Sequence, residues 1–327
     1  MANPLDRGAG AGGAEPVAEG LGLLHEDGRS VRATWNGNEL FRYVYTPWEP
    51  QLESPRPYFH PLRTLGGDLV SVYRPHDHVW HKGISFALSN VGTENFWGGV
   101  TCVRDEKEGY KYKQLDNNGA MRHQGLDLLA LRDGVLRFDE ELLWITQGGE
   151  KYITEKRRIG VTAFPELGAW QLTFESTMDN VSDDIIAFGS PGTNGRDNAG
   201  YSGLFWRGPR SFSHGQIVTP EGTGGDELMG TRGPWMGFVG RHDGQGTAST
   251  LVFRDNADNF CHPTEWFART GIYAVVCPAP FFSEEYPLAS DTSFTLRYDV
   301  SIADGPLDQE GCETLVDKAA CVDLLAD

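Results

Sequence analysis

Short runs in which every second residue is apolar recur along this chain, and turn dipeptides separate them. The clearest run spans residues 293–302, where apolar side chains at the even positions alternate with polar ones at the odd positions. A period of two is typical of a strand with one buried face. The dipeptides Asn36-Gly37, Asp133-Gly134 and Gly148-Gly149 lie between such runs and favour hairpin turns. We therefore expect antiparallel strands joined by short connections.

Helical periodicity is confined to the C-terminal end, residues 312–327, where apolar residues recur every three or four positions. Because a sheet with one apolar face must bury it against another layer, we predict an all-β fold: a large antiparallel β-sandwich with a short C-terminal helix. Residues 1–20 are rich in Gly and Ala and lack periodicity. We expect them to be a disordered segment and residues 21–327 to form a single sandwich domain.

The net charge limits the possible binding partners of the protein, and the cysteine content indicates its compartment. The formal net charge is −18, which argues against nucleic acid or an anionic membrane as a partner. No stretch approaches the roughly 20 apolar residues that span a bilayer. The five cysteines form no CxxC pair, so a reducing compartment is expected. We predict a cytoplasmic protein with a small-molecule substrate; a homo-oligomer is compatible with the sequence.

The segment richest in candidate catalytic side chains is a histidine cluster. His76, His78 and His81 fall between two segments with strand character, residues 66–74 and 84–89. A connection between strands is where a scaffold commonly displays functional side chains. Three uses stay open: solvated or core histidines, acid or base catalysis, and ligation of a divalent metal with His60 as a fourth ligand. The sequence leaves the identity of any cofactor unknown.

A carboxylate is the expected complement to a catalytic histidine. Glu265 is the leading candidate, because the neighbouring Trp266 and Phe267 provide apolar surroundings that would raise its pKa. Asp226 and Glu227 are alternatives, although a glycine-flanked acidic pair also serves to hold a turn. Motifs of phosphate-binding loops, nucleophile elbows and dinucleotide-binding folds are absent from the sequence.

Arginines and tryptophans provide the expected substrate contacts. Guanidinium groups hold carboxylates or pairs of hydroxyls in a fork, and indole rings pack on the apolar face of a sugar. Arg207, Arg210 and Arg269 also lie beside aromatic or acidic residues, but ion pairing within the protein is an equally good reading. The residues predicted to bind substrate are His60, Arg74, Trp80, Glu94, Trp97, Asn194, Arg196 and Trp206.

Long sequence blocks carry a family resemblance. The blocks HDHVWHKG at residues 76–83 and NGRDNAGY at residues 194–201, with GGDELMG and CPAPFF downstream, resemble the bacterial family labelled PmoA, or methane oxygenase. The resemblance covers nearly all of the chain after residue 20. It implies a soluble β-sandwich of the galactose-mutarotase-like kind, a class rich in carbohydrate-active enzymes, and it brings no catalytic assignment with it.

Together these observations predict a carbohydrate-processing enzyme. The leading hypothesis is a lyase or hydrolase that acts on a glycoside or a keto-sugar, with His76, His78, His81 and Glu265 as the catalytic candidates. A sugar epimerase or mutarotase is one alternative. A sugar-binding protein without catalysis is another.

Overall fold

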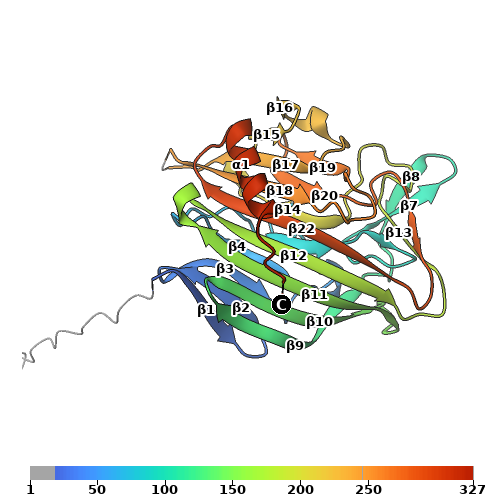
Figure 1. Cartoon of the computed structure of the whole chain (residues 1–327). Coiled ribbons are helices and arrows are strands. Elements are labelled where there is room, and N and C mark those ends of the chain that lie inside the picture. Colours follow the sequence, from blue (N-terminus) through green and yellow to red (C-terminus); the bar gives the residue numbers. More distant parts are fainter. Residues whose placement is uncertain (1–18, 245, 327) are drawn as a thin grey trace, which may run out of the picture.

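Two large antiparallel sheets stacked on each other make up most of the molecule (Figure 1). The structure is a computed structural model that describes residues 19–244 and 246–326. The predicted all-β sandwich with a short C-terminal helix is confirmed. Apart from residues 19 and 20, the segment expected to be disordered lies outside the described residues.

The first sheet has eight strands and carries the N-terminal half of the fold. Its strands in spatial order are β1 (Leu21–Glu26), β2 (Ser30–Trp35), β3 (Asn38–Val44), β4 (Tyr58–Leu62), β5 (Ile84–Ala87), β14 (Gly203–Arg207), β20 (Val275–Pro278) and β19 (Trp266–Arg269).

The second sheet has nine strands and contains the longest ones. In spatial order they are β16 (Gly222–Gly224), β15 (Gln216–Thr219), β17 (Trp235–Arg241), β18 (Ala248–Asp255), β22 (Ser293–Asp304), β12 (Ala169–Asn180), β11 (Lys151–Phe164), β10 (Val135–Ile145) and β9 (Ala120–Arg132).

Smaller elements complete the fold. The strands are β6 (Asn90–Val91), β13 (Ile186–Gly189) and β21 (Tyr286–Leu288) in one sheet, and β7 (Thr101–Asp105) and β8 (Gly109–Lys113) in a hairpin. The short 3-10 helices are Gln51–Glu53, Pro165–Leu167, Arg210–Phe212 and Asp226–Leu228. Helix α1 (Gln309–Ala320) begins where the carboxylate of Asp308 accepts a hydrogen bond from the backbone N–H of Gly311. No helix in the described ranges is long and apolar enough to cross a membrane.

Turn chemistry explains the hairpins. Asn36 and Gly37 have φ values of 48° and 81°, and Asp133 and Gly134 have φ values of 50° and 76°. Positive φ at both central residues is what a type I′ turn requires, and its twist matches that of the flanking strands. The predicted hairpins at these two dipeptides are therefore confirmed as the β2–β3 and β9–β10 connections.

The segment before the histidine cluster differs from its prediction. Residues 66–74 form no regular strand and make only isolated bridges, such as Tyr73 with Lys82. The backbone N–H of Val72 donates to Arg207 O at the end of β14, and the N–H of Gly83 donates to Val72 O. These two bonds join the segment to the end of β14 and to Gly83, which follows the histidines. The segment is therefore an irregular insertion and not a strand of the sheet. It carries the histidine loop over the outer face of the eight-stranded sheet.

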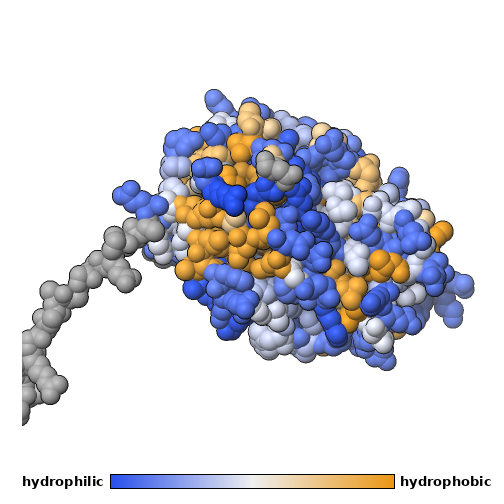
Figure 2. All heavy atoms as spheres, turned by 60° about the horizontal axis from the view of Figure 1, so that its bottom comes forward, coloured by the Kyte–Doolittle hydropathy of each residue, from blue (hydrophilic) through white to orange (hydrophobic). Residues whose placement is uncertain are grey.

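Alternation decides which side chains face the core. On β22 the even-numbered apolar residues are buried against the other sheet, as the sequence pattern predicts. Helix α1 covers part of the opposite face of the nine-stranded sheet through Cys312 and Leu315 (Figure 1). β1 and β9 each form one edge of their sheet, and their partly buried leucines pack against the core at the end of the molecule where Figure 2 shows an apolar area.

Candidate functional site

A second apolar cluster covers the outer face of the eight-stranded sheet. Leu204 and Trp206 of β14 point into the sandwich core, so Phe205 and Arg207 between and beyond them point outward. The same alternation on β19 places Phe267 and Arg269 on the outer side. Phe205, Phe267 and Arg269 line a pocket on this outer face.

This pocket has a volume of about 360 Å³. Aromatic rings form most of its wall, and imidazole, guanidinium and phenol groups supply its polar atoms. Its lining residues are His78, Trp80, His81, Trp97, Gly98, Val100, Tyr112, Arg196, Tyr201, Phe205, Phe267, Arg269, Ile272 and Tyr273. Mostly apolar walls with a few convergent polar groups are the usual composition of a small-molecule site.

The histidine loop is closed by its own backbone. The N–H of Arg74 donates to His81 O, and the N–H of His81 donates to His78 O. This compact turn stacks the rings of His78 and His81 with their centroids 4.7 Å apart and their planes 15° from parallel. Two imidazoles with different environments therefore lie side by side in the pocket wall.

Asp77 fixes the tautomer of His78. The distance between Nδ1 of His78 and Oδ2 of Asp77 is 2.9 Å. Partial burial raises the pKa of Asp77, but the hydrogen bonds from His78 and Arg207 outweigh it and hold that pKa well below its usual range. Since the ionised carboxylate accepts only, Nδ1 of His78 carries the proton. In the described chain no hydrogen bond engages Nε2, which leaves it as a free acceptor.

Arg207 fixes the opposite tautomer in His81. Nη1 of Arg207 lies 2.8 Å from Nδ1 of His81, and a guanidinium can only donate. Nδ1 of His81 is therefore the acceptor, and Nε2 carries the proton. Burial lowers the pKa of His81 well below its usual range, and the positive charges of a protonated His78 and of Arg207 lower it further. The buried imidazole is thus a neutral N–H donor.

Arg207 is itself held tightly. Its guanidinium lies over the ring of Tyr273 at 3.8 Å, and its Nη2 donates to Asp77 at 3.0 Å. Asp77 receives a second ion pair from Arg210 at 2.6 Å. This carboxylate therefore organises both imidazoles, one directly and one through Arg207.

A buried ionic cluster supports the pocket tryptophans. Arg56 donates to the backbone oxygens of Trp80 and Trp97, at 2.7 Å and 2.9 Å. Nζ of the fully buried Lys82 lies 3.3 Å from Glu49 and 3.2 Å from Glu53. Burial lowers the pKa of Lys82 to about 8, although both glutamates oppose that shift.

Several of the predicted site residues meet in this pocket. They are His78, His81, Trp80, Trp97 and Arg196. His76 lies on the same loop, but its ring is exposed and Nδ1 contacts Arg210 at 3.0 Å. Arg74 turns away and pairs with the buried Glu53 at 2.7 Å.

Other predicted residues are used inside the protein. Trp206 is fully buried in the core and donates to Val70 O at 2.8 Å. His60 contacts Ser71 Oγ at 2.9 Å, and burial lowers its pKa to about 4. Neither residue lines the pocket.

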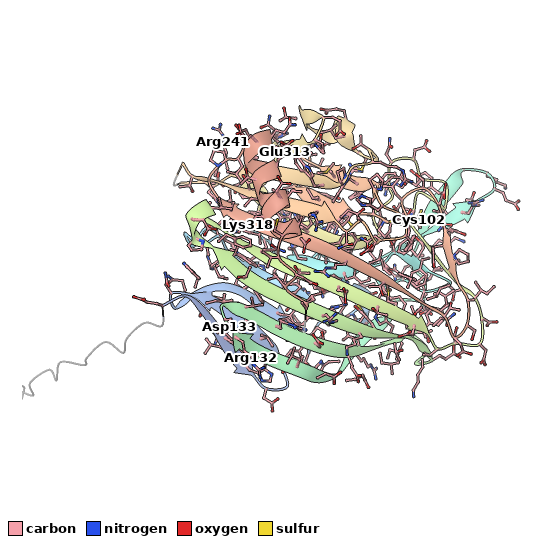
Figure 3. All side chains as sticks on the ribbon, viewed as in Figure 1. Cys102, Arg132, Asp133, Arg241, Glu313 and Lys318 are labelled. Carbon is pink, nitrogen blue, oxygen red and sulfur yellow. The ribbon has the colours of Figure 1, made fainter. Side chains whose placement is uncertain are left out.

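The remaining three also have protein partners. Glu265 pairs with Arg232 at 3.1 Å and accepts from Ser283 at 2.8 Å. Glu94 accepts from the backbone N–H of Gln147, and Asn194 donates to the backbone oxygen of Cys102 beside the pocket. Cys102 lies on β7, in the β7–β8 hairpin that contributes Tyr112 to the pocket (Figure 3).

The histidines do not assemble a metal site. Within residues 19–244 and 246–326, no group of three or more His, Cys, Asp or Glu side chains is placed to hold a metal ion. Nδ1 of His76 and Nδ1 of His81 are occupied by arginines. The set of three histidine ligands suggested by the sequence spacing is therefore not assembled within these residues.

Sequence reasoning missed Tyr112, Tyr273 and the part played by Arg207. β14, with the sequence GLFWR, is buried on both faces. Its residues therefore lack the polar alternation that would have separated Phe205 and Arg207 from the core residues. Tyr201 belongs to the NGRDNAGY block, which was the one available signal for its position.

Comparison with known proteins gives the family but no activity. No curated protein matches the chain. Solved structures with a similar strand arrangement include galactose 1-epimerase from Lactobacillus acidophilus, with 9% identity over 88% of this chain and 100% of that one, at a TM-score of 0.37. A putative aldose 1-epimerase from Klebsiella pneumoniae has 8% identity over 91% of this chain and 81% of that one, at a TM-score of 0.34.

Larger enzymes also match in part. An α-galactosidase from Geobacillus stearothermophilus has 8% identity over 94% of this chain, at a TM-score of 0.39, and the match covers 43% of the galactosidase. A putative kojibiose phosphorylase from the human microbiome is covered over 29% of its length. The family that matches has no described activity, so the methane oxygenase label suggested by the sequence blocks gains no support from it. Through residues 30–317, the chain belongs to the family described as "Family of unknown function (DUF6807)".

Proposed function

We propose that the pocket binds a single sugar residue and that the chain is a carbohydrate-processing enzyme, a lyase or hydrolase acting on a keto-bearing sugar. The observation that carries this proposal is the pair of stacked imidazoles with opposite tautomers. His78 offers a free Nε2 acceptor, and His81 offers a neutral Nε2–H donor. A base beside a neutral donor is the arrangement that removal of a proton next to a carbonyl requires.

The chemistry follows from these two nitrogens. Nε2 of His78 removes the proton from the carbon next to the carbonyl, and the electron pair forms an enolate. The enolate oxygen accepts a hydrogen bond from His81. Loss of the glycosidic oxygen from the next carbon then gives an enone, and the imidazolium of His78 returns its proton to that oxygen. Addition of water to the enone completes a net hydrolysis, so lyase and hydrolase differ in the fate of one intermediate.

The pocket walls support this use. A volume of about 360 Å³ accommodates one sugar ring with its substituents. The rings of Trp80 and Trp97 provide apolar surfaces, and exclusion of water strengthens the hydrogen bonds that stabilise an enolate. An epimerase needs an acid and a base on opposite faces of the sugar, whereas His78 and His81 are neighbours in one stack. The geometry therefore favours elimination over epimerisation.

Glycosides and their 3-keto derivatives, screened by mass spectrometry, test the proposal. We expect His78→Ala and His81→Ala to lower the turnover of the substrate by at least about 100-fold, the usual contribution of one general acid or base. His76→Ala is the matched control, because His76 lies on the same loop outside the pocket. It should change turnover less than about threefold.

The products distinguish the alternatives. An unsaturated or hydrolysed sugar supports the proposal, whereas an epimer as the sole product assigns the site to epimerisation. Wild-type rates in both histidine variants would refute the acid–base assignment. Binding of sugars without any product, unchanged in His81→Ala, would identify a binding protein without catalysis.

A further inference from the structure

The charge of the pocket is opposite to that of the protein. The chain carries 46 acidic and 28 basic residues. Nevertheless, the lining of this pocket in the described chain includes Arg196 and Arg269 and no Asp or Glu. The neighbouring carboxylate of Asp77 is already shared by Arg207 and Arg210. The wall of the pocket therefore holds positive charge that the protein does not neutralise.

Arg196 is oriented by an aromatic ring instead of a carboxylate. Its guanidinium lies over the ring of Tyr112 at 5.3 Å and donates to the hydroxyl of the same residue. The Tyr112 hydroxyl is also 2.8 Å from that of Tyr201. Within the described residues Arg196 forms no ion pair. The N–H groups that are not bonded to Tyr112 are therefore available to a ligand.

Arg269 has still fewer partners. Its guanidinium lies over the ring of Phe267 at 5.5 Å, and its Nε is buried without a hydrogen bond. Asp226 is close enough for Arg269 to influence its pKa. However, Oδ1 of Asp226 accepts from the backbone N–H groups of Thr270 and Gly271, and no ion pair joins Asp226 to Arg269 in the described residues. Because a buried donor without a partner costs free energy, a ligand that supplies the acceptor is favoured.

From this charge pattern we infer that the sugar bound in the pocket carries a carboxylate, and that Arg196 and Arg269 recognise it. The inference rests on the proposed function for the sugar itself and adds the substrate class: uronic acids or other acidic sugars. Guanidinium groups bind carboxylates through charge-assisted hydrogen bonds that are about twice as strong as neutral ones. Among the described residues, the pocket wall has no Lys, Ser or Thr side chain and no helix N-terminus, the groups that commonly accompany arginine at phosphate sites.

Matched pairs of ligands test the inference without requiring turnover. Glucuronate and glucose, and galacturonate and galactose, differ mainly in the carboxylate; the methyl esters of the two acids remove its charge. Binding is measured by titration calorimetry and by the tryptophan fluorescence of the protein, to which Trp80 and Trp97 in the pocket wall contribute. We expect at least one acid to bind about tenfold more tightly than its neutral partner and its ester. This preference should weaken as salt rises from 50 to 500 mM.

Arginine variants assign the preference to residues. Arg196→Gln and Arg269→Gln should each lower the affinity for the acid by about tenfold and leave the neutral sugar unchanged. Arg269→Lys keeps the charge and should lose less. Arg241→Gln is the control, because Arg241 is exposed and lies outside the pocket. Thermal unfolding of each variant verifies that it folds.

Each result decides the inference. Equal binding within every matched pair, including no binding of either member, would contradict it, as would acid binding that survives both Gln substitutions. Preference for glucose 6-phosphate over both acids would assign the positive charge to a phosphate instead. Turnover of neutral glycosides with no acid preference would keep the proposed function and reject this inference. Acid binding through the arginines without turnover of any sugar would support this inference and reject the proposed enzymatic function.

Discussion

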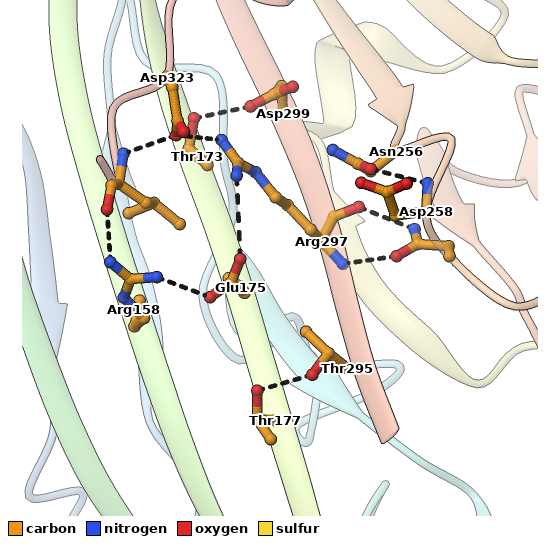
Figure 4. A network of polar contacts seen from close by, with 12 residues as sticks. Arg158, Thr173, Glu175, Thr177, Asn256, Asp258, Thr295, Arg297, Asp299 and Asp323 are labelled. Atoms are coloured by element: carbon orange, nitrogen blue, oxygen red, sulfur yellow. Dashed lines mark hydrogen bonds and ion pairs between the residues drawn. The ribbon is translucent and has the colours of Figure 1, made fainter. Parts of the chain in front are cut away.

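Arginines on the outer faces of the two sheets are used in different ways. On the nine-stranded sheet, Arg297 pairs with Asp323 and Glu175, and Arg158 pairs with Glu175 (Figure 4). In the pocket on the outer face of the eight-stranded sheet, Arg196 and Arg269 lie over aromatic rings and have no ion pair in the described residues, whereas Arg207 beside them pairs with Asp77. Pairing within the protein holds a surface together, whereas an unpaired guanidinium in a pocket is available to a ligand. If the proposal holds, the comparison separates arginines that stabilise the fold from arginines that bind the ligand.

The largest effect is expected where a paired arginine is also buried. Arg157 faces the core, donates to both oxygens of Glu155 at 2.8 and 2.9 Å, and donates to the hydroxyl of Tyr43. Arg157→Met leaves Glu155 and Glu140 buried without this cation. We expect the free energy of unfolding to fall by about 3–5 kcal/mol, as measured by urea denaturation. A loss below about 1 kcal/mol would show that the core does not depend on this ion pair.

An intermediate effect should appear with pH at His81. Its pKa in the folded state is held below the ordinary value of about 6.5, so the unfolded chain binds a proton that the folded chain does not. Stability contributed by this residue is therefore complete above pH 6.5 and is lost as the pH falls toward the folded-state pKa.

Comparison with a neutral variant isolates this effect. Between pH 6.5 and pH 5.0, the free energy of unfolding of the wild type should fall by up to about 2 kcal/mol more than that of His81→Gln. Equal pH dependence in the two proteins, or a charged His81 ring seen by NMR at pH 5, would show that Arg207 does not hold the imidazole neutral.

The smallest effects compare the two surfaces directly. Arg297→Gln breaks partly exposed ion pairs and should lower the free energy of unfolding by up to about 1 kcal/mol. Arg269→Gln breaks no ion pair and should change it by less than about 0.5 kcal/mol. Urea denaturation at low and high salt measures both, and salt should reduce only the Arg297 effect. A larger loss for Arg269→Gln would place that residue among the stabilising arginines.

Local pattern predicted several strands, although not correctly at residues 66–74, and it did not predict the pocket. The alternation at residues 293–302 and the turns at Asn36-Gly37 and Asp133-Gly134 depend on neighbouring residues, and all three were predicted. The loop bearing His78 and His81 was also found, because its residues are close together in the sequence.

The rest of the pocket depends on contacts across the chain. Arg207 reaches His81 from a strand more than a hundred residues away, and no alternation marks which side of β14 it occupies. Trp206 illustrates the same difficulty, since a tryptophan beside glycines resembles a loop residue until strand pairing places it in the core. Side-chain direction on a strand buried on both faces cannot be obtained from composition alone.

The central claim is that the outer face of the eight-stranded sheet binds an acidic sugar between the stacked imidazoles and the unpaired arginines. A crystal structure of the protein with the tightest-binding acid of the matched pairs tests it most directly. The account predicts the sugar ring against Trp80 and Trp97, with a carboxylate oxygen within hydrogen-bond distance of Arg196 or Arg269. A ligand bound instead in the larger surface hollow beside Arg241, with the histidine pocket empty, would contradict it.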